Sequence, residues 1–153
     1  MALNELNPPI GSGAKAIRAW VKEQMKAQVP RGLIYVALLD APFPDELEEM
    51  EAVQDAQQEL GDILTQRNIE GEEAERKGNI DRAIELYEEN VEDRFDGSHP
   101  YDRLRIIYAR LGRYEDAIRV CNVYLQDLAF DPDLCNSYNK WISKYRSKME
   151  SEK

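Results

Sequence analysis

Histidine and cysteine are scarce in this chain, which has one histidine, His99, and two cysteines among 153 residues. Metal centres and disulfide-stapled folds need clusters of these residues, and no Cys-x-x-Cys pair or His-Glu-x-x-His sequence occurs. A glycine-rich phosphate loop is also missing. Several acidic residues lie close to Glu48 in the sequence, but on a helix their side chains point in different directions around the axis and do not converge on one ion. The sequence therefore predicts no catalytic residues, no metal and no cofactor, and we expect a protein that is not an enzyme.

Long apolar runs are missing as well. No segment approaches the roughly eighteen apolar residues of a membrane span, and the first residues lack the basic start and apolar stretch of a signal peptide. We therefore expect no membrane span and a cytoplasmic location. Cys121 and Cys135 fit this expectation, because both fall at apolar helical positions, where free thiols are usual in a reducing compartment.

The acidic and basic residues are unevenly distributed along this chain, whose formal net charge is -10. Residues 40–99 hold twenty acidic and five basic residues, whereas residues 1–39 hold two acidic and five basic ones, and residues 100–153 hold eight and ten. Nucleic-acid binding needs a continuous basic face, so this distribution predicts no strong nucleic-acid signal. It favours protein partners or docking of the chain's own segments.

What the sequence does have is an internal repeat. The frame Gly-Asn-Ile-Asp-Arg-Ala-Ile-x-x-Tyr starts at Gly78, and Gly-Arg-Tyr-Glu-Asp-Ala-Ile-x-x-Cys starts at Gly112, 34 residues later. A unit of two short helices cannot bury its apolar face alone, so neighbouring units stack and leave an inner surface free to hold another molecule. The period therefore predicts an all-α protein whose role is binding.

The repeat resembles the tetratricopeptide repeat family, with its 34-residue helix-turn-helix pattern. Arg105 stands where that pattern has a small residue, which predicts either a looser helix pair or an arginine whose head reaches solvent. The resemblance implies a short helix-turn-helix solenoid that acts as an adaptor or scaffold. The pattern positions are occupied by Gly71, Ala74, Ala83 and Tyr87 in the first unit and by Tyr101, Leu104, Tyr108 and Ala117 in the second.

The remaining segments frame this array. Prolines and glycines in residues 1–13 indicate a flexible arm, residues 14–63 a helical N-terminal extension, residues 64–130 the two repeats, and residues 131–153 a capping helix. The apolar run Leu33–Leu39 is compatible with a strand or a buried helix, and the helical surroundings favour helix. Apolar spacing and turn residues predict the other helices at 14–28, 45–67, 68–77, 80–94, 100–111, 114–128 and 133–149.

The inner surface of the array is the predicted binding site. If Tyr101 and Tyr108 face the core, residues displaced around the same helix line this surface. We expect it to bind a protein or peptide, either an acidic peptide or a chain-terminal carboxylate, with Arg103 and Arg110 as bidentate anchors. The alternative is that these arginines are solvated or neutralised by acidic helices. The candidate partner-binding residues are Asn68, Ile69, Arg76, Arg103, Ile106, Arg110, Lys140 and Lys144.

A second hypothesis concerns residues 14–29, a basic amphipathic helix with Trp20 between Ile17 and Val21. Such a helix is compatible with a nucleic-acid-associated or membrane-peripheral regulator. The simpler interpretation docks its cations on the acidic segment that follows, within one chain or in a homo-oligomer. A homo-oligomer stays open because Leu33–Leu39 can be buried either within the chain or against a copy.

Overall fold

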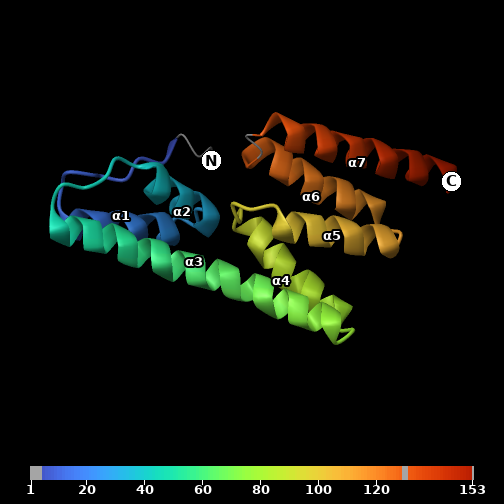
Figure 1. The fold of residues 1–153 in the computed structure, drawn as a ribbon, viewed down its shortest axis with the longest axis horizontal. Coiled ribbons are helices and arrows are strands. Elements are labelled where there is room, and N and C mark those ends of the chain that lie inside the picture. Colours follow the sequence, from blue (N-terminus) through green and yellow to red (C-terminus); the bar gives the residue numbers. More distant parts are fainter. Residues whose placement is uncertain (1–4, 129–130, 153) are drawn as a thin grey trace. The chain divides into compact units, whose positions relative to one another are not determined.

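The computed structural model describes residues 5–128 and 131–152, and within them it has seven α-helices and no strand (Figure 1). The predicted all-α class is therefore confirmed. The chain divides into two compact units. The described residues up to Gln66, together with Asp93–Asp96, form unit 1, and Arg67–Glu92 with the described residues from Gly97 onward form unit 2.

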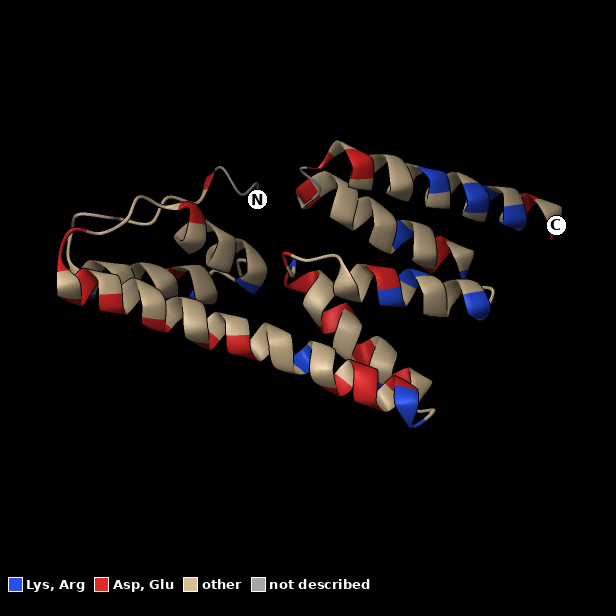
Figure 2. Cartoon of the chain, viewed as in Figure 1, with Lys and Arg blue, Asp and Glu red and all other residues tan. Residues whose placement is uncertain are grey.

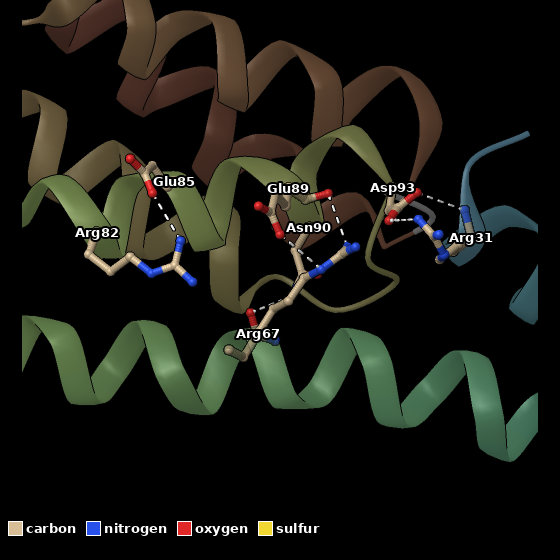
Figure 3. Close-up of polar contacts among 8 residues, drawn as sticks. Arg31, Arg67, Arg82, Glu85, Glu89, Asn90 and Asp93 are labelled. Atoms are coloured by element: carbon tan, nitrogen blue, oxygen red, sulfur yellow. Dashed lines mark hydrogen bonds and ion pairs between the residues drawn. The ribbon is translucent and has the colours of Figure 1, made fainter. Parts of the chain in front are cut away.

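Unit 1 contains α1 (Ala14–Lys26), α2 (Arg31–Asp40) and the first part of α3 (Leu47–Arg76). The apolar run Leu33–Leu39 lies in α2, as the favoured interpretation predicts, and most of its side chains are buried. Gly32 is required in α2, because a Cβ atom there would lie 1.9 Å from the carbonyl oxygen of Arg94. Next to it, Arg31 forms a 3.0 Å ion pair with Asp93 (Figure 3). Both contacts attach α2 to Asp93–Asp96, the segment that follows α4 (Ile80–Glu92).

Residues 5–13 form no long helix, in keeping with their prolines and glycines, but they are attached to α3. Leu6 is buried, and the amide of Gly11 donates a 2.5 Å hydrogen bond to the carboxylate of Glu49, which also accepts from the amide of Gly13. Composition alone could not reveal this attachment. Residues 1–4 of the predicted arm lie outside the described residues.

Helix α3 corrects one prediction. Separate helices at 45–67 and 68–77 are wrong, because a single helix runs from Leu47 to Arg76. No proline occurs between Pro44 and Pro100 to interrupt it. At the predicted break, the side chain of Asn68 does not cap a new helix but accepts a 2.9 Å hydrogen bond from the Asn90 side chain on α4.

Unit 2 is built from the end of α3, α4 (Ile80–Glu92), α5 (His99–Arg110), α6 (Tyr114–Asp127) and α7 (Pro132–Ser151). Successive helices pack on one another from α4 to α7, as in a solenoid of helix hairpins (Figure 1). Gly78 and Gly112 have φ angles of 78° and 74° and follow the first helix of each hairpin, which is a usual way for a helix to end. Ala83 and Ala117 are fully buried at equivalent places.

Helix α7 covers the end of this array with Tyr138, Ile142 and Tyr145, which are all buried. Its exposed side carries Lys140 and Lys144, as expected of a capping helix. Cys121 on α6 and Cys135 on α7 are both free thiols. None of the helices in the described part of the chain combines the length and the apolar character that a membrane crossing needs.

Candidate functional site

Three carboxylates in unit 2 each accept a hydrogen bond from a tyrosine and from an arginine. Each of them links different helices, so these carboxylates and tyrosines are satisfied within the unit. Hydrogen bonds to charged groups are the stronger kind, and these three clusters therefore help to hold the stacked helices together. They are Glu75 with Tyr87 and Arg103, Glu88 with Tyr108 and Arg119, and Asp102 with Tyr138 and Arg105.

Arg103, a predicted anchor for a ligand, belongs to the first of these clusters. Its Nη2 and Nε atoms lie 2.6 and 3.1 Å from the two carboxylate oxygens of Glu75. Burial raises the pKa of Glu75, but the hydrogen bonds from Arg103 and Tyr87 outweigh it, so the pKa of this carboxyl is lowered overall. The guanidinium of Arg103 is thus engaged inside unit 2.

Four other predicted residues are distributed over α3 and α7. Asn68 is buried between α3 and α4, beside the contacts that Arg67 makes with Asn90 and Glu89 (Figure 3). Ile69 and Arg76 are exposed on α3, and Lys140 is exposed on α7. None of these four residues lines the pocket described next.

Helices α5, α6 and α7 enclose a pocket of about 230 Å³, here called the α5–α7 pocket. It brings together three of the predicted residues, Ile106 and Arg110 from α5 and Lys144 from α7. Its floor is apolar and aromatic, whereas its rim is basic. The complete lining consists of Arg105, Ile106, Ala109, Arg110, Tyr114, Trp141, Lys144, Tyr145 and Lys148.

Arg105 and Trp141 form one wall of the pocket. The guanidinium carbon of Arg105 lies 4.3 Å from the centre of the Trp141 ring, and its Nε donates a 3.2 Å hydrogen bond to Asp102. The Trp141 and Tyr145 rings stack at a centroid distance of 6.1 Å. The expectation that the head of Arg105 reaches solvent is wrong, because its side chain is only 12% exposed and packs on α7.

The rim of the pocket carries three exposed cations, Arg110, Lys144 and Lys148. Within the described residues, none of their side chains has a hydrogen bond or an ion pair, although the Lys144 Nζ lies 5.2 Å from the centre of the Trp141 ring. Blue segments at the end of α5 and along α7 mark this side of unit 2 (Figure 2). Unpaired positive charge beside an aromatic floor suits a ligand that is both anionic and apolar.

The described residues also bear on the hypothesis for the N-terminal helix. Lys15, Arg18, Lys22 and Lys26 are all exposed on α1, at spacings that place them on one side of the helix. No ion pair joins them to the acidic residues of the described chain. Docking of these cations on the acidic segment within one chain is therefore not observed there.

Comparison with family models, with curated proteins and with solved structures finds no match to this chain. The resemblance to tetratricopeptide repeats therefore remains a prediction.

Sequence reasoning missed the aromatic part of the pocket. Trp141 and Tyr145 fall on the apolar side of the last helix, so periodicity assigns both to the core. The signal that could have found them is Arg105, a large cation at a position where the repeat pattern has a small residue. Such a side chain must leave its own helix pair, and the aromatic residues of the next helix are natural partners for a guanidinium.

Proposed function

We propose that this protein is a protein-interaction module, an adaptor or scaffold built from tetratricopeptide-like repeats, that binds an acidic segment of a protein partner. The α5–α7 pocket is the proposed binding site. The observation that carries this proposal is the combination of three exposed cations that have no partner among the residues the structure describes, Arg110, Lys144 and Lys148, with a floor that contains Trp141 and Tyr145.

The two parts of the pocket have different roles in this proposal. Exposed ion pairs contribute at most about 1 kcal/mol each, so the rim cations attract and orient the ligand more than they hold it. Burial of an apolar side chain against the floor supplies about 1.5–3 kcal/mol. At about 230 Å³, the pocket is smaller than the roughly 300–1,000 Å³ clefts that hold drug-sized ligands. It suits one large side chain of a peptide whose neighbouring residues are acidic.

The proposal makes no use of catalysis or of a cofactor. In the described residues, no group of three or more His, Cys, Asp or Glu side chains is arranged to hold a metal ion. We also propose a cytoplasmic location, because the buried Cys121 is a free thiol, which is the usual state in a reducing compartment.

Fluorescence anisotropy with labelled synthetic peptides tests the proposed function. An acidic peptide with a central aromatic residue should bind the full chain, and a peptide with lysines in place of the acids should not. Lys144→Glu should weaken binding about tenfold or more, which corresponds to about 1.4 kcal/mol, because it replaces attraction at the rim by repulsion. Added salt should also weaken binding, since rim charges are screened.

Arg146→Glu is the matched control. Arg146 is exposed on the same helix and makes the same change of charge, but it does not line the pocket. Equal binding by the wild type, Lys144→Glu and Arg146→Glu would show that the pocket is not the binding site.

A second candidate function rests on α1, whose four exposed cations have no ion pair among the described residues. A basic amphipathic helix of this kind fits a membrane-peripheral or nucleic-acid-associated regulator. Sedimentation with vesicles that contain anionic lipid, and a gel shift with duplex DNA, distinguish the two. Replacing Lys22 and Lys26 by glutamate should abolish whichever interaction occurs, and absence of both interactions for the full chain rules this candidate out.

A further inference from the structure

Large apolar side chains are exposed at the end of α2, in the connection to α3 and at the start of α3. Leu39, Phe43 and Leu47 are 55%, 75% and 65% exposed, and they lie within nine positions of one another in the sequence. Single exposed apolar residues are normal, but several of them close together in the sequence favour an interaction site. Phe43 is the most exposed large apolar residue among those that the structure describes.

Residues 39–48, here called the Phe43 segment, are also acidic. The side chains of Asp40, Asp45, Glu46 and Glu48 are exposed, and none of them has an ion pair or hydrogen bond within the described residues. The segment thus presents one large aromatic side chain between unpaired carboxylates. Carboxylates and a free aromatic ring are groups that the cations and the aromatic floor of the α5–α7 pocket would bind.

The backbone of the Phe43 segment is restricted in a way that favours binding. Phe43 lies between Pro42 and Pro44, and residues 42–44 belong to no helix or turn. A proline has a fixed φ angle and restricts the residue before it to extended conformations. An extended segment that is already restricted loses less conformational entropy when it binds.

We infer that the acidic partner of the α5–α7 pocket is the Phe43 segment of a second copy of this chain. This inference rests on the proposed function and names its ligand. The Phe43 ring enters the pocket and lies against Trp141 and Tyr145, while the carboxylates on both sides of it face the cations of the rim. Both charge and apolar surface are complementary.

This contact joins two different surfaces, so it is heterologous. Each copy has one pocket and one Phe43 segment. After one contact has formed, the copy that contributed its pocket still has a free Phe43 segment, and the other copy still has a free pocket. Association therefore increases as the protein concentration rises, and it ends in closed assemblies with every pocket filled or continues to longer chains. High salt weakens it, because the rim charges are exposed and screened.

Sedimentation velocity of the full chain over a range of concentrations tests the inference. The wild type should show species larger than a monomer that grow with concentration. Phe43→Ser, which keeps the pocket, and Lys144→Glu, which keeps the segment, should each be at least about tenfold weaker in association. Leu111→Ser is the control, since it removes another exposed large apolar side chain, 53% exposed against 75% for Phe43, outside the pocket and should associate like the wild type.

Mixing the two defective variants gives the sharpest result. In an equimolar mixture, the pocket of Phe43→Ser can still bind the segment of Lys144→Glu, so dimers should form again and should not grow further. A monomeric wild type at all concentrations, or a mixture that stays monomeric, would overturn the inference. Circular dichroism of each variant verifies that the helices are retained.

Peptide binding separates this inference from the proposed function. A labelled peptide with residues 38–50 of this chain should bind the wild type and should bind Lys144→Glu at least about tenfold more weakly. If an unrelated acidic peptide with a central aromatic residue binds and this peptide does not, the inference fails and the proposed function stands. If neither peptide binds, the proposed function fails as well.

Discussion

The two helix pairs of unit 2 have the same frame but place their large side chains differently. In the first pair, α3 contributes Gly71 and α4 contributes Tyr87, whereas the equivalent positions in α5 and α6, 34 residues later, hold Arg105 and Cys121. Gly71 leaves room for the Tyr87 ring, because a Cβ atom at Gly71 would lie 2.6 Å from the ring. In the first pair, the small residue is on the first helix and the large residue on the second helix, and in the second pair this order is reversed.

This reversal changes which helix the large side chain contacts. Tyr87 fills the space beside Gly71, and its hydroxyl donates a 2.6 Å hydrogen bond to Glu75 on α3, while its ring also meets the His99 ring of α5 edge to face. Arg105 instead leaves its pair and packs on Trp141 of α7. The large side chain of the first pair therefore packs mainly against its partner helix, whereas that of the second pair reaches the capping helix and forms a wall of the pocket. In this protein, the repeated sequence pattern specifies the helix pairs, and Arg105, which departs from that pattern, forms part of the candidate site.

Gly71→Ala should have the largest effect on stability. Overpacking of a core costs about 1–3 kcal/mol, and displacement of the Tyr87 ring also breaks its hydrogen bond to Glu75. After the gain of about 1 kcal/mol from better helix propensity, the free energy of unfolding should fall by about 2 kcal/mol. Urea denaturation followed by circular dichroism measures it.

Gly61→Ala is the control for this change, because it lies on the same helix and its Cβ atom would be 3.3 Å from the nearest atom of Tyr35. It gains the same helix propensity with a milder contact and should be close to neutral. If both variants were equally stable, close packing at Gly71 would not distinguish the first pair from the second.

Arg105→Ala tests the second pair, by restoring the small residue that the repeat pattern has there. It removes the stacking on Trp141 and the hydrogen bond to Asp102, and it should lower the free energy of unfolding by about 1 kcal/mol. Binding of acidic peptides should weaken as well, since a wall of the pocket is lost. Arg105→Lys retains the charge but not the planar stacking group, so only partial rescue is expected. Unchanged peptide binding by Arg105→Ala would contradict the link between this reversal and the pocket.

Glu75 gives the first pair a pH-dependent contribution to stability that the second pair lacks, because the equivalent residue in the second pair is Ala109. The folded-state pKa of Glu75 lies below the ordinary value of 4.5, so its stabilising effect is present above that pH and is lost as the pH falls through the folded-state pKa. Glu75→Gln should therefore lose stability at neutral pH and show a flatter decline in acid. Thermal unfolding at a series of pH values measures this, and parallel curves for variant and wild type would contradict it.

The smallest expected effect concerns Cys121, which occupies the position equivalent to Tyr87. Its thiol should react more slowly in the folded protein than in the unfolded protein. Burial raises the pKa of the Cys121 thiol to about 12, with a smaller opposing effect of the Arg105 charge. At pH 8 this thiol is therefore almost entirely protonated and unreactive. A disulfide exchange reagent should react slowly with folded Cys135→Ser, in which only Cys121 remains, and quickly once urea unfolds it. Fast reaction of the folded variant would show that the fold does not shield the Cys121 thiol from the reagent.

Much of the fold could be predicted because its causes are local. The spacing of apolar residues predicts α1 and α4 to α7, the helical surroundings favour a helix at α2, and glycines at 78 and 112 predict where the first helix of each hairpin ends. The helix break near Asn68 was predicted wrongly, because an asparagine at that point is compatible with a cap or with a helix interior. Its partner Asn90, 22 residues away in sequence, decides between the two.

The candidate site was predicted less completely, because its residues depend on contacts between distant segments. The sequence alone determined that helix pairs recur every 34 residues and that cations gather near the end of α5 and along α7, since period and charge are properties of the chain. Only the tertiary structure decided that Arg103 pairs with Glu75, that Arg105 packs on Trp141, and that Arg110 has no ion pair or hydrogen bond among the described residues. A guanidinium binds whichever carboxylate or ring the packing of neighbouring helices brings within reach, and no local pattern specifies that choice.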